Sequence, residues 1–218
     1  MVTISGLSFG CDVSAYQEPT LVDWDDERIN FAILKASENL TEDKRVREHS
    51  AAVRSAKKPV GLYQFFHPDT DVSRQFTVFK VVADAVEYGG NGDIVPAIDI
   101  EYFRLHEVTP KWCDPLRAFA DLLEATFAKP LLYCSRSTWI CLGRPEWLLE
   151  YPLWVPFYMM DGLEPTQTLS ASHVPGERDD WCIWQRYVGK LFGTKQNTKA
   201  TGAVDQNWAQ RIPRIGVV

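Results

Sequence analysis

The sequence has no segment that marks a membrane-spanning or exported protein. None of its apolar runs approaches the about 20 residues that a transmembrane helix needs, so we expect no membrane partner. The first residues, Met-Val-Thr-Ile-Ser-Gly-Leu, contain no basic stretch followed by an apolar core. That pattern predicts no secretory signal and a protein made for the cytoplasm, or one that leaves it by another route.

The sequence also lacks the side-chain patterns of metal, redox and phosphate sites. Its four histidines include no pair at ligand spacing, and its five cysteines form no C-x-x-C pair. No G-x-x-x-x-G-K-S/T loop is present to bind a phosphate. We therefore expect no metal and no cofactor, and we expect cysteines that stay reduced and mostly buried.

Basic residues are also fewer than acidic ones. The chain has 23 Lys and Arg residues against 29 Asp and Glu, which gives a formal net charge of -6. Nucleic acids and anionic wall polymers are held electrostatically by clustered Lys and Arg, so we expect neither as a partner bound mainly by charge. The substrate should be neutral, or recognised locally.

Apolar material is sufficient for one sizeable core. A chain of 218 residues, 45% of them hydrophobic, can bury about 70% of its unfolded surface. No linker, low-complexity tract or internal repeat divides it. We expect a single domain over residues 1–218, and we take the protein to be a monomer.

Short apolar strands alternate with helical patterns in the first two thirds of the chain, which is typical of βα units around a parallel sheet. Helices are expected at residues 45–58, 71–88 and 110–127, with at most a short one at 137–141. After Trp147 the segments between strands are rich in Gly, Pro, Thr and Ser and carry no convincing helix. The strands are expected at residues 7–13, 31–35, 60–65, 95–100, 131–134, 153–157, 181–187 and 202–205. This order predicts an α/β fold, a barrel that begins as a (β/α) repeat and finishes with bare strands.

Two carboxylates end the strand at residues 95–100. Side chains of a strand alternate, so Asp99 and Glu101 share one face. Beside an apolar run their pKa values should be pushed apart, leaving one protonated and one ionised near neutral pH, as acid-catalysed glycosidic cleavage requires. A structural alternative is that they cap a helix or pair with Arg104.

Other acidic residues follow strand ends, and in a parallel barrel all such ends meet at one mouth. Asp12 ends the first strand, Glu38 follows the second and Asp205 ends the last. His67 follows the third strand and could line the cleft, but a loop histidine whose hydrogen bonds are satisfied within the protein is the favoured interpretation. Hydrogen bonding to backbone at the barrel rim is the alternative for the aspartates, and an ion pair with Lys35 or Lys44 is the alternative for Glu38.

The motifs at these strand ends resemble the glycoside hydrolase family 25 muramidases, also called Chalaropsis-type lysozymes. The resemblance extends over nearly the whole chain, and the set of motifs in this order is specific although each is weak alone. The matching segments are Gly10–Gln17 (G-C-D-V-S-A-Y-Q), Asp23-Trp24, Phe31–Glu38 (F-A-I-L-K-A-S-E), Val60–Phe66 (V-G-L-Y-Q-F-F), Ala97–Glu101 (A-I-D-I-E), Leu153–Val155 with Tyr158, Trp184-Gln185, and Val204–Asn207 (V-D-Q-N).

The resemblance implies an irregular TIM-like (β/α)5(β)3 barrel that cleaves the β-1,4 bond between N-acetylmuramic acid and N-acetylglucosamine in bacterial peptidoglycan. Glu101 matches the family's proton donor and Asp99 its second carboxylate, while Asp12 and Asp205 match the acidic groups that flank the sugar. Asp99 would either activate water or orient the substrate's own 2-acetamido group, and we favour the second. The chain departs from the family pattern at Gln64, where His is usual.

Aromatic residues at strand ends are candidates for stacking on sugar faces, because a sugar ring packs well against an aromatic ring. We select Tyr63, Trp154, Tyr158 and Trp184 for this role, with Glu38 as a further substrate-binding candidate. The family pattern usually has Gly after Glu38, and Asn39 at this position predicts a loop of different shape.

Taken together, the residues predict a muramidase with Glu101 as general acid. The lack of a signal and of a wall-binding repeat suggests a phage endolysin that a holin releases from the host cytoplasm; an injected effector or a virion-associated lysin would have the same sequence features. A catalytically silent glycan-binding module on the same barrel is the alternative from another class. A glycan deacetylase would need metal ligands that the sequence does not offer.

Overall fold

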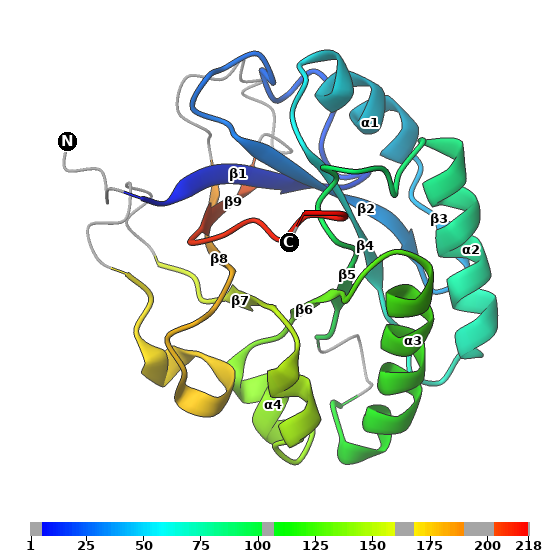
Figure 1. The fold of residues 1–218 in the computed structure, drawn as a ribbon, viewed down its shortest axis with the longest axis vertical. Helices are drawn as coiled ribbons and strands as arrows, with labels where there is room; N and C mark the ends of the chain where they lie inside the picture. Colours follow the sequence, from blue (N-terminus) through cyan, green and yellow to red (C-terminus); the bar gives the residue numbers. More distant parts are fainter. Residues whose placement is uncertain (1–5, 102–106, 160–167, 190–202, 218) are drawn as a thin grey trace.

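A computed structural model describes residues 6–101, 107–159, 168–189 and 203–217. Within these ranges the strands form one sheet in the order β1-β9-β8-β7-β6-β5-β4-β2-β3, and a further pairing of β1 with β2 closes eight of them into a barrel (Figure 1). The closed barrel confirms the predicted fold class. The strands are β1 (Ser8–Val13), β2 (Phe31–Glu38), β3 (Thr41–Glu42), β4 (Val60–Phe65), β5 (Ala97–Asp99), β6 (Leu131–Tyr133), β7 (Leu153–Pro156), β8 (Ile183–Gly189) and β9 (Val204–Ala209).

The barrel strands β1, β2 and β4 through β8 run parallel to one another, and β9 runs antiparallel to both of its neighbours. The last strand was predicted at residues 202–205 with Asp205 at its end, and this is wrong in detail: β9 starts at Val204, so Asp205 is its second residue. Because β9 is reversed, its start lies at the same mouth as the ends of the parallel strands. Asp205 is paired with Asp12 in the β1–β9 register.

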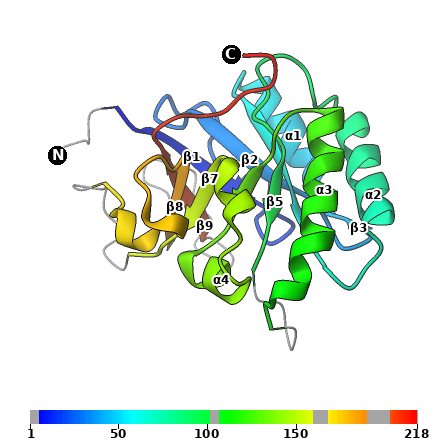
Figure 2. The same cartoon turned by 60° about the horizontal axis from the view of Figure 1, so that its bottom comes forward.

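Four α-helices cover the described part of the barrel: α1 (Val46–Ser55), α2 (Val72–Ala85), α3 (Cys113–Thr126) and α4 (Arg136–Cys141). The Asp71 side chain caps α2 by accepting a 2.8 Å hydrogen bond from the backbone N of Arg74. Ser135 caps α4 in the same way, with 2.9 Å to the backbone N of Thr138. Figure 2 shows α1, α2 and α3 side by side along one flank, whereas β1 connects to β2 through turns.

The connections after α4 contain only turns and 3-10 helices in the residues that are described: η2 (Glu146–Glu150), η3 (Ala171–His173) and η4 (Pro175–Glu177). A further 3-10 turn, η1 (Pro110–Trp112), leads into α3. The sequence predicted this loss of helices after Trp147 from its Gly- and Pro-rich segments. The short β3, which folds back on the end of β2, was not predicted.

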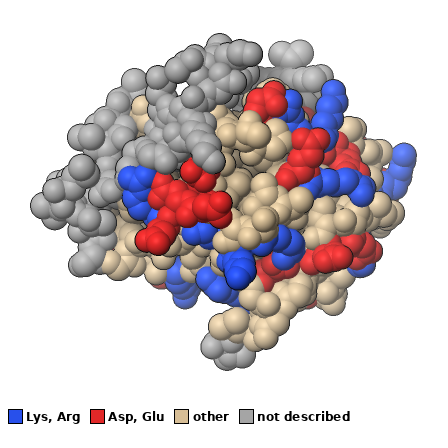
Figure 3. All heavy atoms as spheres, turned by 90° about the horizontal axis from the view of Figure 1, so that it is seen from above, with Lys and Arg blue, Asp and Glu red and all other residues tan. Residues whose placement is uncertain are grey.

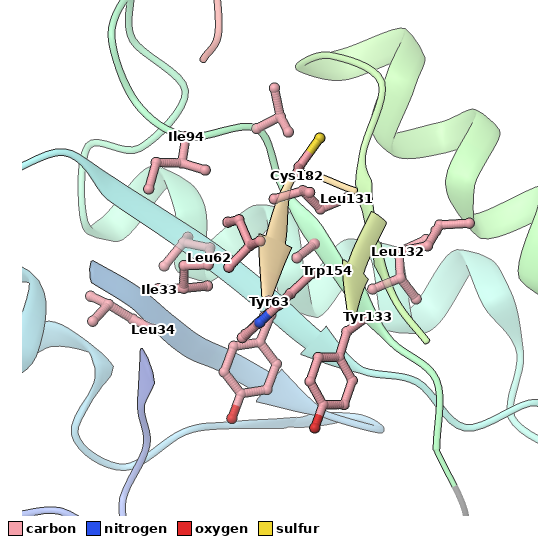
Figure 4. Packing of buried hydrophobic residues seen from close by; sticks show 14 of the residues in the cluster. Ile33, Leu34, Leu62, Tyr63, Ile94, Leu131, Leu132, Tyr133, Trp154 and Cys182 are labelled. Atoms are coloured by element: carbon pink, nitrogen blue, oxygen red, sulfur yellow. The ribbon is translucent and has the colours of Figure 1, made fainter. Parts of the chain in front are cut away.

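Large side chains fill the barrel interior, so it is a packed core. Figure 4 shows Tyr63 and Tyr133 pointing the same way, with their hydroxyls at one end of the core. The Trp154 ring packs edge-on against both, at centroid distances of 6.0 Å and 4.8 Å. Gly10 lies so close to Phe31 that a Cβ there would be 2.6 Å from the Phe31 ring.

Figure 1 shows the C-terminal segment crossing one end of the barrel, and its hydrogen bonds place it where β5 begins, at the end opposite to Asp99. The backbone N of Ile215 donates to the Asp93 oxygen at 2.8 Å, and the backbone N of Val95 donates to the Pro213 oxygen at 3.0 Å. Ile215 is buried there. This segment covers the apolar floor beneath the strand that leads to Asp99.

The cysteines are free thiols, as expected from the sequence, and the charges of the surface are mixed. All five cysteines are free, and Cys11, Cys134 and Cys182 are buried while Cys141 is exposed. On the face shown in Figure 3, acidic and basic residues are interspersed. No described helix is long and apolar enough to cross a membrane.

Candidate active site

Four carboxyl groups lie at one mouth of the barrel, as the strand ends predicted. Asp12 is on β1 and Asp99 is the last residue of β5, and they are 5% and 7% exposed. Glu101 follows β5 by two residues, and Asp205 is the second residue of β9. Their charges act on one another, since Asp205 and Glu101 raise the pKa of Asp12, and Glu101 raises those of Asp99 and Asp205.

Burial is the main cause of the raised pKa values in this cluster. Loss of water contact raises the pKa of Asp12 and of Asp99 well above the ordinary range, and neighbouring carboxylates raise them further. The pKa of Asp205 is raised to about 6 by burial and by Glu101. Burial also raises the pKa of Glu101. These raised pKa values favour the protonated form of the carboxyls, which is the form that a general acid requires.

Amide side chains from β8 and β9 donate hydrogen bonds to Asp12. Its Oδ2 accepts 2.9 Å from Gln185 Nε2 and 2.7 Å from Asn207 Nδ2. Asn207 Oδ1 in turn accepts 2.8 Å from the indole N of the buried Trp154. These hydrogen bonds fix the orientation of the Asp12 carboxyl and lower its pKa against the effect of burial.

Gln185 also links Asp12 to two tyrosines. Its Oε1 accepts hydrogen bonds of 2.6 Å from the Tyr133 hydroxyl and 2.5 Å from the Tyr158 hydroxyl. Gln185, Asn207 and Tyr133 were not among the site residues predicted from the sequence. Gln185 and Asn207 were visible as parts of matching motifs, but only the pairing of the strands shows that their amides meet Asp12.

Asp99 differs from Asp12 in its surroundings. Its Oδ1 is buried and has no hydrogen-bond partner among the described residues. The positive charge of Lys35 lowers the pKa of both Asp99 and Glu101. A buried carboxylate oxygen with this free accepting capacity can take a hydrogen bond from a bound N–H or water.

Lys35 was considered only as a partner for Glu38, and the structure shows that ion pair, with 2.6 Å between Lys35 Nζ and Glu38 Oε2. His67 Nε2 lies 3.5 Å from the other oxygen of Glu38. The Lys35 ammonium is also 4.9 Å from the centroid of the Phe65 ring. Glu38 therefore faces the mouth as part of an ion pair, and Lys35 supplies positive charge next to the carboxylates.

The predicted sugar-binding aromatics differ in exposure. Tyr158 is 51% exposed, but Tyr63 is 8% exposed and Trp154 and Trp184 are each 2% exposed. The Trp184 indole N donates 2.8 Å to the Phe157 oxygen. Tyr158 therefore has a ring face open to solvent, whereas the tryptophans support the loop and the amide network beneath the site.

A cleft of about 440 Å³ lies next to Glu101, over β5, β6 and β7. Tyr133, Tyr158 and Phe157 form its aromatic part. Its polar part comes from Ser135 and Thr138. Aromatic faces with a few neutral hydrogen-bonding groups are suited to a sugar ring.

The two departures from the family pattern are found in different places. Gln64 is fully buried and contacts the scaffold: its Oε1 accepts from Ser37, and its Nε2 donates 3.1 Å to the Asn39 oxygen. Gln64 therefore has no surface for a sugar. Asn39 has a φ of 54°, the left-handed conformation that glycine adopts freely and Asn tolerates.

One further motif matches the pattern around the nucleophilic serine of some hydrolases, but it lies in the wrong part of the fold. Residues Gly6-Leu7-Ser8-Phe9-Gly10 fit G-x-S-x-G. Ser8 is the first residue of β1, at the end of the barrel away from the carboxylates, and is not on a strand-to-helix turn. The described residues also contain no group of three His, Cys, Asp or Glu that could hold a metal.

Comparison with known proteins identifies the family and the fold of the chain. The model of the family described as glycosyl hydrolases family 25 matches residues 11–190. The fold is similar to a bacterial lysozyme from Streptomyces coelicolor, at 22% identity and a TM-score of 0.72 over 94% of this chain and 92% of that one. It is also similar to the catalytic domain of endolysin ply40 from bacteriophage P40 of Listeria monocytogenes, at 19% identity and a TM-score of 0.70 over 93% of both chains. A search of curated proteins found no match.

A barrel with buried carboxylates beside an aromatic cleft is suited to glycosidic bond cleavage, and the family match identifies the class of protein as a glycoside hydrolase. The family match covers most of the chain, and the chain belongs to the glycosyl hydrolases of family 25. A family 25 lysozyme from Aspergillus fumigatus has the same fold, at 19% identity and a TM-score of 0.70, with 93% of each chain covered.

Proposed function

We propose that this glycoside hydrolase is a muramidase that cleaves the β-1,4 bond between N-acetylmuramic acid and N-acetylglucosamine in bacterial peptidoglycan. The observation that carries the proposal is the buried carboxylate cluster beside an aromatic cleft, in a chain of family 25. The similarity in fold to lysozymes supports the choice of peptidoglycan.

Glu101 is the proposed general acid. It lines the aromatic cleft, and burial raises its pKa, so that it keeps a proton to give to the leaving oxygen. The requirement for a protonated Glu101 predicts an activity maximum between about pH 4.5 and 7.

Asp99 is the proposed second carboxylate. Its unpartnered buried Oδ1 is suited to accept a hydrogen bond from the substrate's 2-acetamido N–H, which would turn the acetamido oxygen toward the anomeric carbon as an internal nucleophile. Activation of water by the same oxygen is the alternative. Lys35 would favour the ionised form that either role needs.

Asp12 and Asp205 are proposed to flank the sugar, with Asp12 oriented by Gln185 and Asn207. Tyr158, with its open ring face, is the proposed stacking residue. The proposed role of the buried rings is to support the site residues that contact the sugar; these rings are Tyr63, Trp154 and Trp184. Glu38 would contribute through its ion pair with Lys35.

The proposed biological role is lysis of bacterial cells, as a phage endolysin that a holin releases from the host cytoplasm. The likeness in fold to an endolysin catalytic domain supports this role. Expression in a bacterial host with and without a holin tests it: lysis should require the holin, and equal lysis in both cultures would contradict holin-dependent release.

The catalytic assignment is tested by the release of reducing sugar from purified peptidoglycan. Glu101→Gln should reduce the release at least 100-fold, because a positioned proton donor contributes about 10²–10⁴-fold. Asp99→Asn should also reduce it strongly, because the neutral amide lacks the negative charge with which Asp99 would orient the acetamido N–H or activate water. Unchanged release in both variants would contradict the assignment. Absence of release by the wild-type protein would favour a glycan-binding module.

A further inference from the structure

A second cleft, of about 650 Å³, opens over the ends of β1 and β2 and over the turn to β3. Lys35, Glu38 and His67 form the part of its wall nearest the carboxylates. Lys35 also acts on the pKa of Asp99 and of Glu101, so this cleft begins at the reacting centre. Its lining is charged, whereas the 440 Å³ cleft beyond Glu101 is aromatic.

Two of the acidic groups in the charged cleft have partners in the protein. Glu42 Oε1 accepts 2.7 Å from Arg47 Nε. Asp43 accepts 2.9 Å from the backbone N of Ala15 with one oxygen and 2.9 Å from the backbone N of Arg45 with the other. These carboxylates hold the loop together and are not available to a ligand.

Lys44 is different, because it is exposed and forms no ion pair with another described residue. Two further residues of interest, Tyr16 and Asn39, line this cleft. Tyr16 is 78% exposed, and the buried Oδ1 of Asn39 has no hydrogen-bond partner in the described part of the chain. A cation, an amide oxygen and an aromatic face together suit a ligand with a carboxylate, N–H groups and apolar carbon.

We propose that the charged cleft binds the stem peptide attached to muramic acid, with Lys44 facing one of its carboxylates. The proposal rests on the proposed function, because peptidoglycan is the polymer that carries such a peptide next to the scissile bond. The sugars between which the bond is cut carry no free carboxylate when the lactyl group is joined to the peptide. The charged cleft thus recognises the peptide, and the aromatic cleft recognises the glycan.

The test compares soluble, uncrosslinked glycan strands that carry stem peptides with strands from which an amidase has removed them. The measured quantity is the ratio of kcat/KM on the two substrates, at low salt and with 0.5 M NaCl. Lys44→Glu is compared with Lys57→Met, which changes an exposed lysine on the turn between α1 and β4, at the other end of the barrel.

Wild type and Lys57→Met should prefer peptide-bearing strands, and Lys44→Glu should lower the ratio three- to tenfold. High salt should lower the wild-type ratio toward that of Lys44→Glu, because it screens an exposed charge pair. If both substrates are cleaved and all three proteins show the same ratio, the stem-peptide assignment is wrong. If wild type cleaves neither substrate, the proposed function itself fails.

Discussion

Asp205→Asn should stabilise the protein at pH 8 and do much less at pH 4.5. A carboxyl whose pKa is higher in the folded than in the unfolded chain binds its proton more tightly when folded. The folded state therefore loses stability as pH rises from the unfolded value to the folded one. For Asp205 this window runs from the ordinary value of 3.8 to about 6.

The size of the effect follows from that window. One pH unit corresponds to 1.36 kcal/mol, so raising the pKa from 3.8 to about 6 lowers stability at pH 8 by about 3 kcal/mol. Glu101 titrates together with Asp205, so a single substitution should recover only part of this, about 1–3 kcal/mol. In a chain of 218 residues that is a rise in Tm of roughly 3–9 °C.

Thermal unfolding at pH 4.5 and pH 8 tests this reasoning. Asp121→Asn, on the exposed face of α3, removes the same charge without a buried cluster around it and is the matched control. We expect it to change stability by no more than about 0.5 kcal/mol at either pH. A gain for Asp205→Asn that is equal at the two pH values, or a loss at pH 8, would refute the account of the carboxylates as a destabilising cluster.

Two other substitutions probe the charge next to the cluster and the packing below it. Lys35→Met removes the cation that lowers the pKa of Glu101, so Glu101 should stay protonated to higher pH. The alkaline limb of the kcat/KM profile should therefore move up by about 0.5–1 pH unit, and an unmoved limb would contradict this. Gly10→Ala forces a Cβ against the buried Phe31 ring and should lower the free energy of unfolding, measured with urea, by about 1–3 kcal/mol. In the control Gly90→Ala the new Cβ meets no atom within 4 Å, so the free energy of unfolding should not fall in this way. Equal effects of the two substitutions would contradict the close packing at Gly10.

The fold was predictable because the alternation of apolar strands with helices is written into the local sequence. Proline after α1, Asp before α2 and the Gly- and Pro-rich segments after Trp147 mark the element ends without reference to the rest of the chain. The direction of β9 was not predictable in this way. Pairing of residues 204–209 with β1 is a contact between the two ends of the chain, and no local signal encodes it.

The site was predictable to the extent that it follows from strand ends. Asp12, Asp99 and Glu101 lie where the end of a parallel strand puts them. The amide network of Gln185 and Asn207 around Asp12 needs three strands in register, and the burial of Trp154 and Trp184 depends on neighbours far away in sequence. Residue type alone does not tell an aromatic that stacks on a sugar from one that supports the layer below.

Mass spectrometry of the soluble products from digests of purified peptidoglycan, after reduction with borohydride, tests the central claim most directly. Wild type should release muropeptides that end in reduced muramic acid, and Glu101→Gln should release none. Products that end in reduced glucosamine, or the same muramic acid ends from both proteins, would contradict a muramidase with Glu101 as its acid.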